Sequence, residues 1–243
     1  MNRFWMLAAL LLPTLSPART LGSLEFSPCT LTAEGVRSPI EAQCARLEVP
    51  EDRAAPDGRR IELALAWLAP DNGEAEADPV FLLAGGPGQS ARESYPAVAT
   101  AFADVLRHRN VILLDQRGTG GSNRLSCPDA DESESARLIA VADLDAVRAA
   151  LGAATINLVG ISYGTRVAQQ YMKAYPERIR SVVLDGVVPN TLVLGQEHAK
   201  NLDASLAMQF AQCAQLPACA GKLGDPRAHF RALAEELRAA PRP

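Results

Sequence analysis

The pentapeptide Gly160-Ile161-Ser162-Tyr163-Gly164 constrains this chain more than any other feature, because of the segments on either side of it. The residues before it (TINLVG, 155–160) read as a buried strand, and residues 163–175 carry an amphipathic helical pattern that Pro176 ends. A serine on such a strand-to-helix turn is forced into a strained backbone conformation that exposes its Oγ. The alternative is an ordinary turn serine. The flanking pattern favours a nucleophile, and we predict that role for Ser162.

Apolar strands alternate with helical patterns up to residue 186, which predicts an α/β fold with a doubly wound, mostly parallel sheet. Pro56-Asp57-Gly58 predicts a hairpin between the first two strands, and residues 19–45 are predicted to be irregular. Two amphipathic helices are predicted after Pro189. The predicted strands are 46–50, 61–68, 80–84, 111–115, 155–160 and 180–185; the predicted helices of the first part are 94–107, a second with the stripe Val141, Leu144, Val147 and Leu151, and 163–175.

A glycine-rich loop, Gly85-Gly86-Pro87-Gly88, follows the apolar strand VFLLA. Acyl transfer requires N–H donors aimed at the oxyanion that forms during the reaction. The residue after the nucleophile, Tyr163, is expected to supply one donor, and the loop after an earlier strand the other. Because Pro87 has no N–H, we predict Gly86 as the second donor. A plain glycine turn is the alternative for this loop.

A second glycine-containing segment, Asp115-Gln116-Arg117-Gly118-Thr119-Gly120-Gly121-Ser122, follows the strand VILLD. Asn123 stands where a dinucleotide-binding fingerprint needs its last glycine, which argues against a nucleotide site. We predict instead a buried ion pair between Asp115 and Arg117 that shapes the loop.

The N-terminus is typical of a secretory signal peptide over residues 1–18, with Arg3 before an apolar run and Ser16-Pro17-Ala18 as a cleavage site. A retained membrane anchor is the alternative. We therefore expect a secreted or periplasmic protein with no membrane contact after cleavage. The formal net charge of −4 argues against a nucleic-acid partner, which would require a clustered basic face.

Five cysteines suit an oxidising compartment. The local pairs Cys29–Cys44 and Cys213–Cys219 are the expected disulfides, and Cys127 is left over, either as a free thiol or with its partner elsewhere. The three histidines (His108, His198 and His229) fall in no metal-ligand spacing, so no metal site is expected. The serine chemistry predicted for Ser162 implies no cofactor.

The GGPG loop, DQRGTGGS, GISYGTR and VVLDGVVP, in this order, resemble the prolyl iminopeptidase and tripeptidyl aminopeptidase group of alpha/beta-hydrolase serine peptidases. The resemblance implies a core over residues 19–190 and the start of a helical cap over 191–243. It also implies a Ser-His-Asp triad that removes residues from peptide N-termini. Ala84 stands where prolyl iminopeptidases usually carry histidine, which favours the tripeptidyl branch.

In that group the triad aspartate and histidine follow the cap, so the resemblance implies that this chain is C-terminally truncated and that a missing C-terminal half is a potential partner. Asp185 and His198 follow Ser162 in the required order and are alternative triad members. The predicted function is a secreted serine hydrolase of the aminopeptidase type that acts on a peptide or small acyl substrate through an acyl-enzyme on Ser162. The alternatives are a carboxylic-ester hydrolase on the same fold and a non-catalytic fragment.

Overall fold

The computed structural model describes residues 18–125, 134–193 and 195–241. The chain divides into two compact units at Asn190, and each is described by itself. The predicted signal peptide, apart from Ala18, and Cys127 lie outside the described residues.

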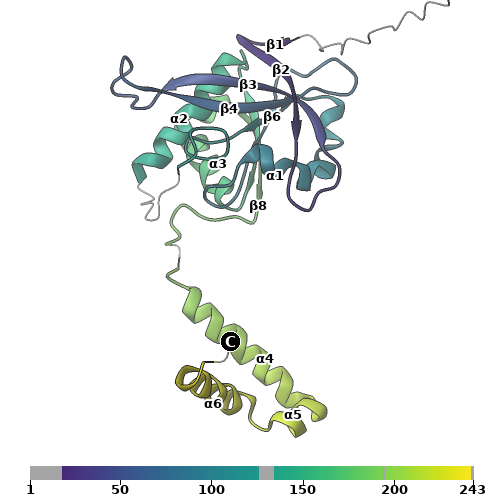
Figure 1. The fold of residues 1–243 in the computed structure, drawn as a ribbon, viewed down its shortest axis with the longest axis vertical. Helices are drawn as coiled ribbons and strands as arrows, with labels where there is room; N and C mark the ends of the chain where they lie inside the picture. The colour runs from purple at the N-terminus through teal and green to yellow at the C-terminus, as the bar shows by residue number, and fades with distance from the viewer. Residues whose placement is uncertain (1–17, 126–133, 194, 242–243) are drawn as a thin grey trace, which may run out of the picture. The chain divides into compact units, whose positions relative to one another are not determined.

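The first unit is built on one mixed sheet of eight strands, counted over the described residues, in the order β1-β2-β3-β4-β6-β5-β7-β8 (Figure 1). Strands β6, β5, β7 and β8 are parallel, which confirms the predicted parallel arrangement, while β1 to β4 extend the sheet with antiparallel pairs. The strands are β1 (Arg19–Leu21), β2 (Leu24–Leu31), β3 (Ile40–Pro50), β4 (Arg60–Leu68), β5 (Val80–Leu83), β6 (Val111–Leu114), β7 (Ile156–Ile161) and β8 (Ile179–Asp185).

The helices of the first unit cover both faces of the sheet. Successive side chains of a strand point to opposite faces, and β5 divides in this way. Phe81 and Leu83 join a core cluster with α2 (Glu134–Ala150) and α3 (Tyr163–Ala174), whereas Val80 and Leu82 join a second cluster with α1 (Ala91–Val98). Figure 1 shows these helices packed about the sheet. Two buried clusters therefore hold the central strands rigidly from both sides.

Two predicted elements are corrected by the structure. Residues 19–45 are not irregular, because β1, β2 and the first half of β3 lie there and pair as an antiparallel set. The predicted helix 94–107 is wrong in its bounds. It begins earlier, as α1 at Ala91, because Ser90 Oγ caps the helix by accepting the Glu93 N–H at 3.1 Å. It continues only as the 3₁₀ turns η1 (Ala99–Phe102) and η2 (Val105–Arg107).

The Cys29–Cys44 disulfide joins β2 to β3, and Cys213–Cys219 closes a short loop in the second unit, so both predicted pairs form. In the chain-entropy view, a loop the size of the first contributes about 3 kcal/mol. No helix in the described ranges is long and apolar enough to span a membrane.

The second unit consists of three helices, counted over the described residues: α4 (His198–Gln215), α5 (Pro217–Leu223) and α6 (Pro226–Ala239). Asp225 caps α6 through its side chain, which accepts the N–H groups of Arg227 and Ala228. Phe210 of α4 and Phe230 of α6 pack with ring centroids 5.8 Å apart.

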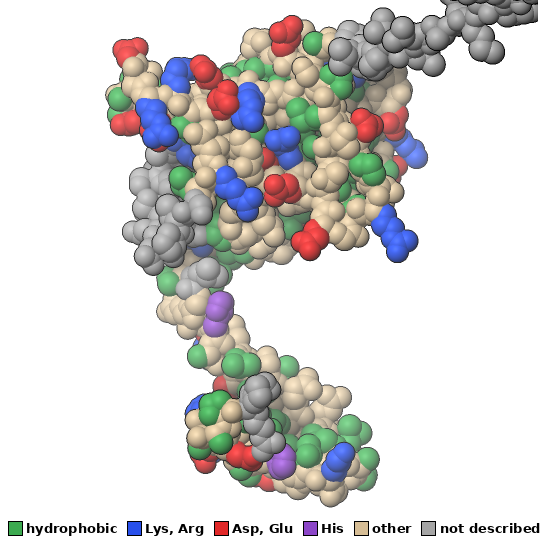
Figure 2. Space-filling model, viewed as in Figure 1, with side chains coloured by type: hydrophobic (Ala, Val, Ile, Leu, Met, Phe, Trp, Pro, Cys, Tyr) green, Lys and Arg blue, Asp and Glu red, His purple; other side chains and the backbone are tan. Residues whose placement is uncertain are grey.

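Figure 2 shows acidic and basic side chains interspersed over the visible face of the first unit.

Candidate active site

Ser162 stands on the turn between β7 and α3 and is solvent-exposed. Its backbone has φ +53° and ψ −115°, a conformation that costs a non-glycine residue of the order of 1–3 kcal/mol. The predicted strain is therefore confirmed. Hydrogen bonds hold the turn on both sides: the Ser162 N–H donates to the Asp185 carbonyl at 2.8 Å, and the Ser162 carbonyl accepts Thr165 Oγ at 2.6 Å.

Gly164, two residues after Ser162, is required by a close backbone approach. A Cβ placed on Gly164 would lie 2.1 Å from the Leu83 carbonyl oxygen and 2.9 Å from that of Ala84. The first turn of α3 thus packs directly against the end of β5. This contact sets Ser162 and the loop after β5 side by side.

The glycine-rich loop after β5 lies beside the serine. A Cβ on Gly85 would lie 3.4 Å from Ser162 Cβ, so the Gly85 backbone lies close to the Ser162 side chain. Gly86 has φ +101°, which a side chain rarely tolerates, and its N–H meets no hydrogen-bond acceptor among the described residues. Tyr163 directly follows Ser162 and is the first residue of α3. The structure thus brings Gly86 and Tyr163 to the same end of the sheet as Ser162; their role as oxyanion donors remains a prediction.

Asp115 fixes the end of the glycine-rich loop. This carboxylate is 1% exposed and accepts hydrogen bonds from Ser90 Oγ at 2.6 Å, from the Arg92 N–H at 3.2 Å and from the Gly121 N–H at 2.9 Å. Ser90 ends the glycine-rich loop and caps α1, so one buried carboxylate joins this loop to the turn after β6. The sequence analysis missed Ser90, although the spacing of Ser90 and Glu93 is that of a capping box.

The predicted ion pair between Asp115 and Arg117 is wrong. Arg117 pairs instead with Asp143 of α2, with Nε to Oδ2 at 2.6 Å and the terminal nitrogen to Oδ1 at 2.9 Å. Asp143 is fully buried and also pairs with Arg53. A forked guanidinium can match both oxygens of one carboxylate. Asp115 instead accepts hydrogen bonds from Ser90, Arg92 and Gly121, and its ion-pair partner is Arg92 at 3.8 Å.

A second carboxylate, Asp145 of α2, holds α3 in place. It accepts Arg148 Nε at 2.7 Å, Tyr171 OH at 3.0 Å and a guanidinium nitrogen of Arg178. Burial would raise the pKa of Asp145, but the hydrogen bonds from these donors outweigh burial and hold it below its usual value. The ionised carboxylate therefore ties α2 to the far end of the helix that begins after Ser162.

Residues 186–190, here called the strap, follow β8 and are hydrogen-bonded to α3. The Val188 N–H donates to Thr165 Oγ at 2.8 Å, Gln169 Nε2 donates to the Val188 carbonyl at 2.9 Å, and Arg166 donates to the Asn190 carbonyl at 3.0 Å. These bonds fix residues 186–190 along α3.

The alternative triad members are placed differently by the structure. Asp185 ends β8, in register with Ile161. It therefore lies at the same end of the parallel strands as Ser162, with its side chain exposed. His198 is the first residue of α4 and belongs to the second unit. His108 precedes β6, at the opposite end of the parallel strands from Ser162. Within the described residues of the first unit, Ser162 Oγ has no hydrogen-bond partner, and the side chain of Asp185 does not contact it through a hydrogen bond.

No group of three or more His, Cys, Asp or Glu side chains within the described ranges is arranged to hold a metal ion.

A family model described as the alpha/beta hydrolase fold matches residues 78–236, which include β5, the glycine-rich loop, the Ser162 turn and most of the second unit. The chain belongs to this family. The match confirms the predicted fold class.

The relatives confirm the predicted peptidase group. Serine protease Hip1 of Mycobacterium tuberculosis (strain ATCC 25618 / H37Rv) is 29% identical over 241 residues, covering 81% of this chain and 46% of that protein. Tripeptidyl aminopeptidase of Streptomyces coelicolor is 28% identical over 194 residues, covering 62% of this chain and 36% of that protein. The crystal structure of proline iminopeptidase from Mycobacterium smegmatis matches with a TM-score of 0.50 and 27% identity, covering 82% of this chain and 63% of that one. The chain spans about half the length, or less, of the curated relatives it matches.

Proposed function

We propose that this chain carries the nucleophile of an exported serine hydrolase of the aminopeptidase type. The observation that supports this most is the turn at Ser162: an exposed serine at φ +53°, at the start of a helix, with the Gly85 backbone against its side chain. The names of the relatives, among them a tripeptidyl aminopeptidase, point to peptides with a free N-terminus as substrates.

In the proposed reaction Ser162 Oγ attacks the carbonyl carbon of a substrate acyl group, and the N–H groups of Gly86 and Tyr163 stabilise the oxyanion that develops. The leaving amine departs with a proton, an acyl-enzyme remains on Ser162, and water releases the acyl group in a second addition. A histidine is required to move the proton. His108 lies at the wrong end of the strands. The histidine is therefore His198 or His229 of the second unit, or one supplied by a further polypeptide segment.

Labelling by a small fluorophosphonate tests the nucleophile. We expect slow labelling of the purified chain that disappears in Ser162→Ala and persists in Ser27→Ala, an exposed serine of β2. Labelling is expected to be slow because Ser162 Oγ contacts no base among the described residues of the first unit, and loss of triad members leaves only about a 10³-fold advantage over water. Labelling that Ser162→Ala does not change would contradict the proposal.

The same assay identifies the base. Rapid labelling that falls in His198→Gln, but not in His229→Gln, assigns the proton transfer to His198, and Asp185→Asn then tests its partner. Slow labelling unchanged in both histidine variants, and accelerated by a further segment added in trans, assigns the base to that segment. Comparison of an aminoacyl arylamide with a short aryl ester separates peptidase from esterase activity.

Export is tested on protein recovered from the periplasm or medium. We expect the mass, measured without reduction, to match a chain beginning at Arg19 with two disulfides, because residues 1–18 resemble a signal peptide and both local cysteine pairs are bonded. A chain that begins at Met1 with five free thiols would show that the protein is not exported.

A further inference from the structure

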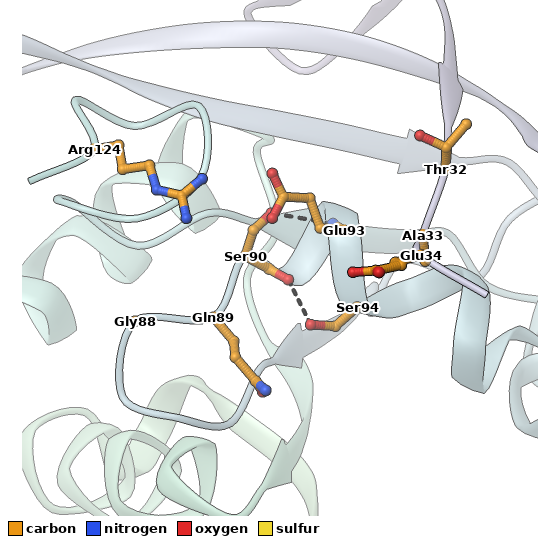
Figure 3. A pocket seen from close by; sticks show the side chains of 9 residues that line it. All are labelled: Thr32, Ala33, Glu34, Gly88, Gln89, Ser90, Glu93, Ser94 and Arg124. Atoms are coloured by element: carbon orange, nitrogen blue, oxygen red, sulfur yellow. Dashed lines mark hydrogen bonds between the residues drawn. The ribbon is translucent and has the colours of Figure 1, made fainter. Parts of the chain in front are cut away.

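A cavity of about 700 Å³ opens beside the glycine-rich loop of the first unit. Its walls come from three places: the turn after β2, the loop and first turn of α1, and Arg124 after β6. Figure 3 shows Arg124 on one side and Glu34 on the other, with Glu93 and Ser94 from the start of α1 between them. The Cys29–Cys44 bridge ties together the two strands that carry the turn with Thr32 and Glu34, so this wall is anchored.

Gln89 lies near both the cavity and the candidate nucleophile. Its side-chain oxygen lies 3.0 Å from the position that a Cβ on Gly85 would take, and that position is 3.4 Å from Ser162 Cβ. Gln89 also lines the cavity. A substrate whose carbonyl carbon is held at Ser162 Oγ would have to pass Gln89 to enter this space.

The lining is hydrophilic, with Ala33 as its one apolar side chain. Glu34 and Glu93 supply carboxylate acceptors, Arg124 supplies donors, and Gln89 and Thr32 supply both. None of these five side chains makes an ion pair within the described part of the chain. An aliphatic acyl chain in this space would displace water from these groups and return no hydrogen bonds. A peptide segment offers both N–H donors and carbonyl acceptors.

We propose that this cavity binds a peptide segment of the substrate by hydrogen bonds and excludes aliphatic acyl chains. The inference rests on the proposed function for the chemistry at Ser162, and it adds the residues that select a peptide over an ester of a fatty acid: Gln89 at the border with Ser162, and Glu34, Glu93 and Arg124 further in.

Direct binding tests this site without turnover. Trialanine amide and heptanamide, an aliphatic amide that lacks internal peptide bonds, are titrated into the full chain carrying Ser162→Ala, with the amide signals of Gly88, Gln89 and Ser94 followed by NMR. We expect trialanine amide to shift these signals and heptanamide to leave them unchanged. Gln89→Ala, Glu93→Ala and Arg124→Ala should each weaken binding by about tenfold, the equivalent of losing one good polar contact. Glu74→Ala, an exposed acid elsewhere on the same unit, is the matched control.

Each result of the titration either supports or overturns the inference. Absence of trialanine amide binding, equal or tighter binding of heptanamide, or cavity variants that behave like Glu74→Ala would overturn the inference. Because the small fluorophosphonate does not fill the cavity, its reaction reports on Ser162 separately. Labelling that depends on Ser162, with peptide binding indifferent to the cavity variants, leaves the proposed function standing and removes this site. Peptide binding that the cavity variants weaken, with no labelling of Ser162, leaves this site standing and removes the proposed function.

Discussion

Gly164→Ala is expected to lower the free energy of unfolding of the first unit by at least about 3 kcal/mol, at the upper end of the cost of overpacking a core. The added methyl would lie 2.1 Å from the Leu83 carbonyl oxygen, and the neighbouring contacts are also backbone atoms. Backbone in the centre of a sheet cannot move aside as a flexible side chain does. Either α3 must shift away from β5 or the end of β5 must leave the sheet.

Chemical denaturation followed by tryptophan fluorescence measures this loss, since Trp67 lies in the core of the first unit. The control is Gly221→Ala in α5, where a Cβ meets nothing within 4 Å and the backbone is helical. That change should be neutral or stabilising by up to about 1 kcal/mol. Because the same contact sets Ser162 beside the glycine-rich loop, labelling of Ser162 should also be lost in Gly164→Ala under conditions where the chain remains folded. A variant as stable as the parent would contradict the close approach of α3 and β5.

Val183→Lys is expected to suppress self-association of the chain. Among the described residues β8 ends the sheet and pairs only with β7, so its outer N–H and C=O groups have no partner strand. Val182 and Leu184 pack against the cluster under α2 and α3, whereas Val183 on the other face is 56% exposed. At about 25 cal/mol per Å², covering roughly 200 Å² of apolar surface contributes about 5 kcal/mol, which is comparable with the stability of many domains. The parent chain should therefore associate or aggregate at micromolar concentration.

Sedimentation velocity over a concentration series measures this association, and Val187→Lys is the matched control. Val187 is 54% exposed and lies just outside the strand, so a charge there changes solubility without placing lysine on the edge. We expect association to weaken at least tenfold in Val183→Lys and to change little in Val187→Lys. The portion of a longer relative that this chain does not match can be added as a separate polypeptide. It should reduce association of the parent chain if it supplies a strand that pairs with β8. A monodisperse parent with a cooperative melt above about 60 °C would show that the edge is harmless.

The central strands could be predicted from the sequence because burial on both faces demands unbroken apolar runs. β5 and β6 are such runs, and both lie where the sequence places them. β2 escapes this reasoning because its exposure alternates and Pro28 interrupts it. The proline is tolerated because β1 covers only Leu24 to Phe26, which leaves one side of β2 open at Pro28.

Some features of the candidate site could likewise be predicted from the sequence, and others could not. The strain at Ser162 follows from a local pattern, strand, turn and helix, which the sequence displays. The partner of Arg117 does not, because Asp143 is 26 residues away and only the packing of α2 against the sheet brings it near. Sequence proximity favours Asp115, whose carboxylate instead meets donors from Ser90 and Gly121. Charges inside a fold are paired by tertiary structure, which a single sequence does not display.

The hydrogen bonds between the strap (residues 186–190) and α3 have a mechanical consequence. Three hydrogen bonds, from Val188 to Thr165 and from Gln169 and Arg166 to carbonyls of the strap, anchor the chain before it enters the second unit. Tension applied beyond Asn190 therefore loads α3 before it can peel β8 from β7. In an optical trap, the first rupture of this unit would free the strap from α3, and the helix that follows Ser162 would be the element that bears the force.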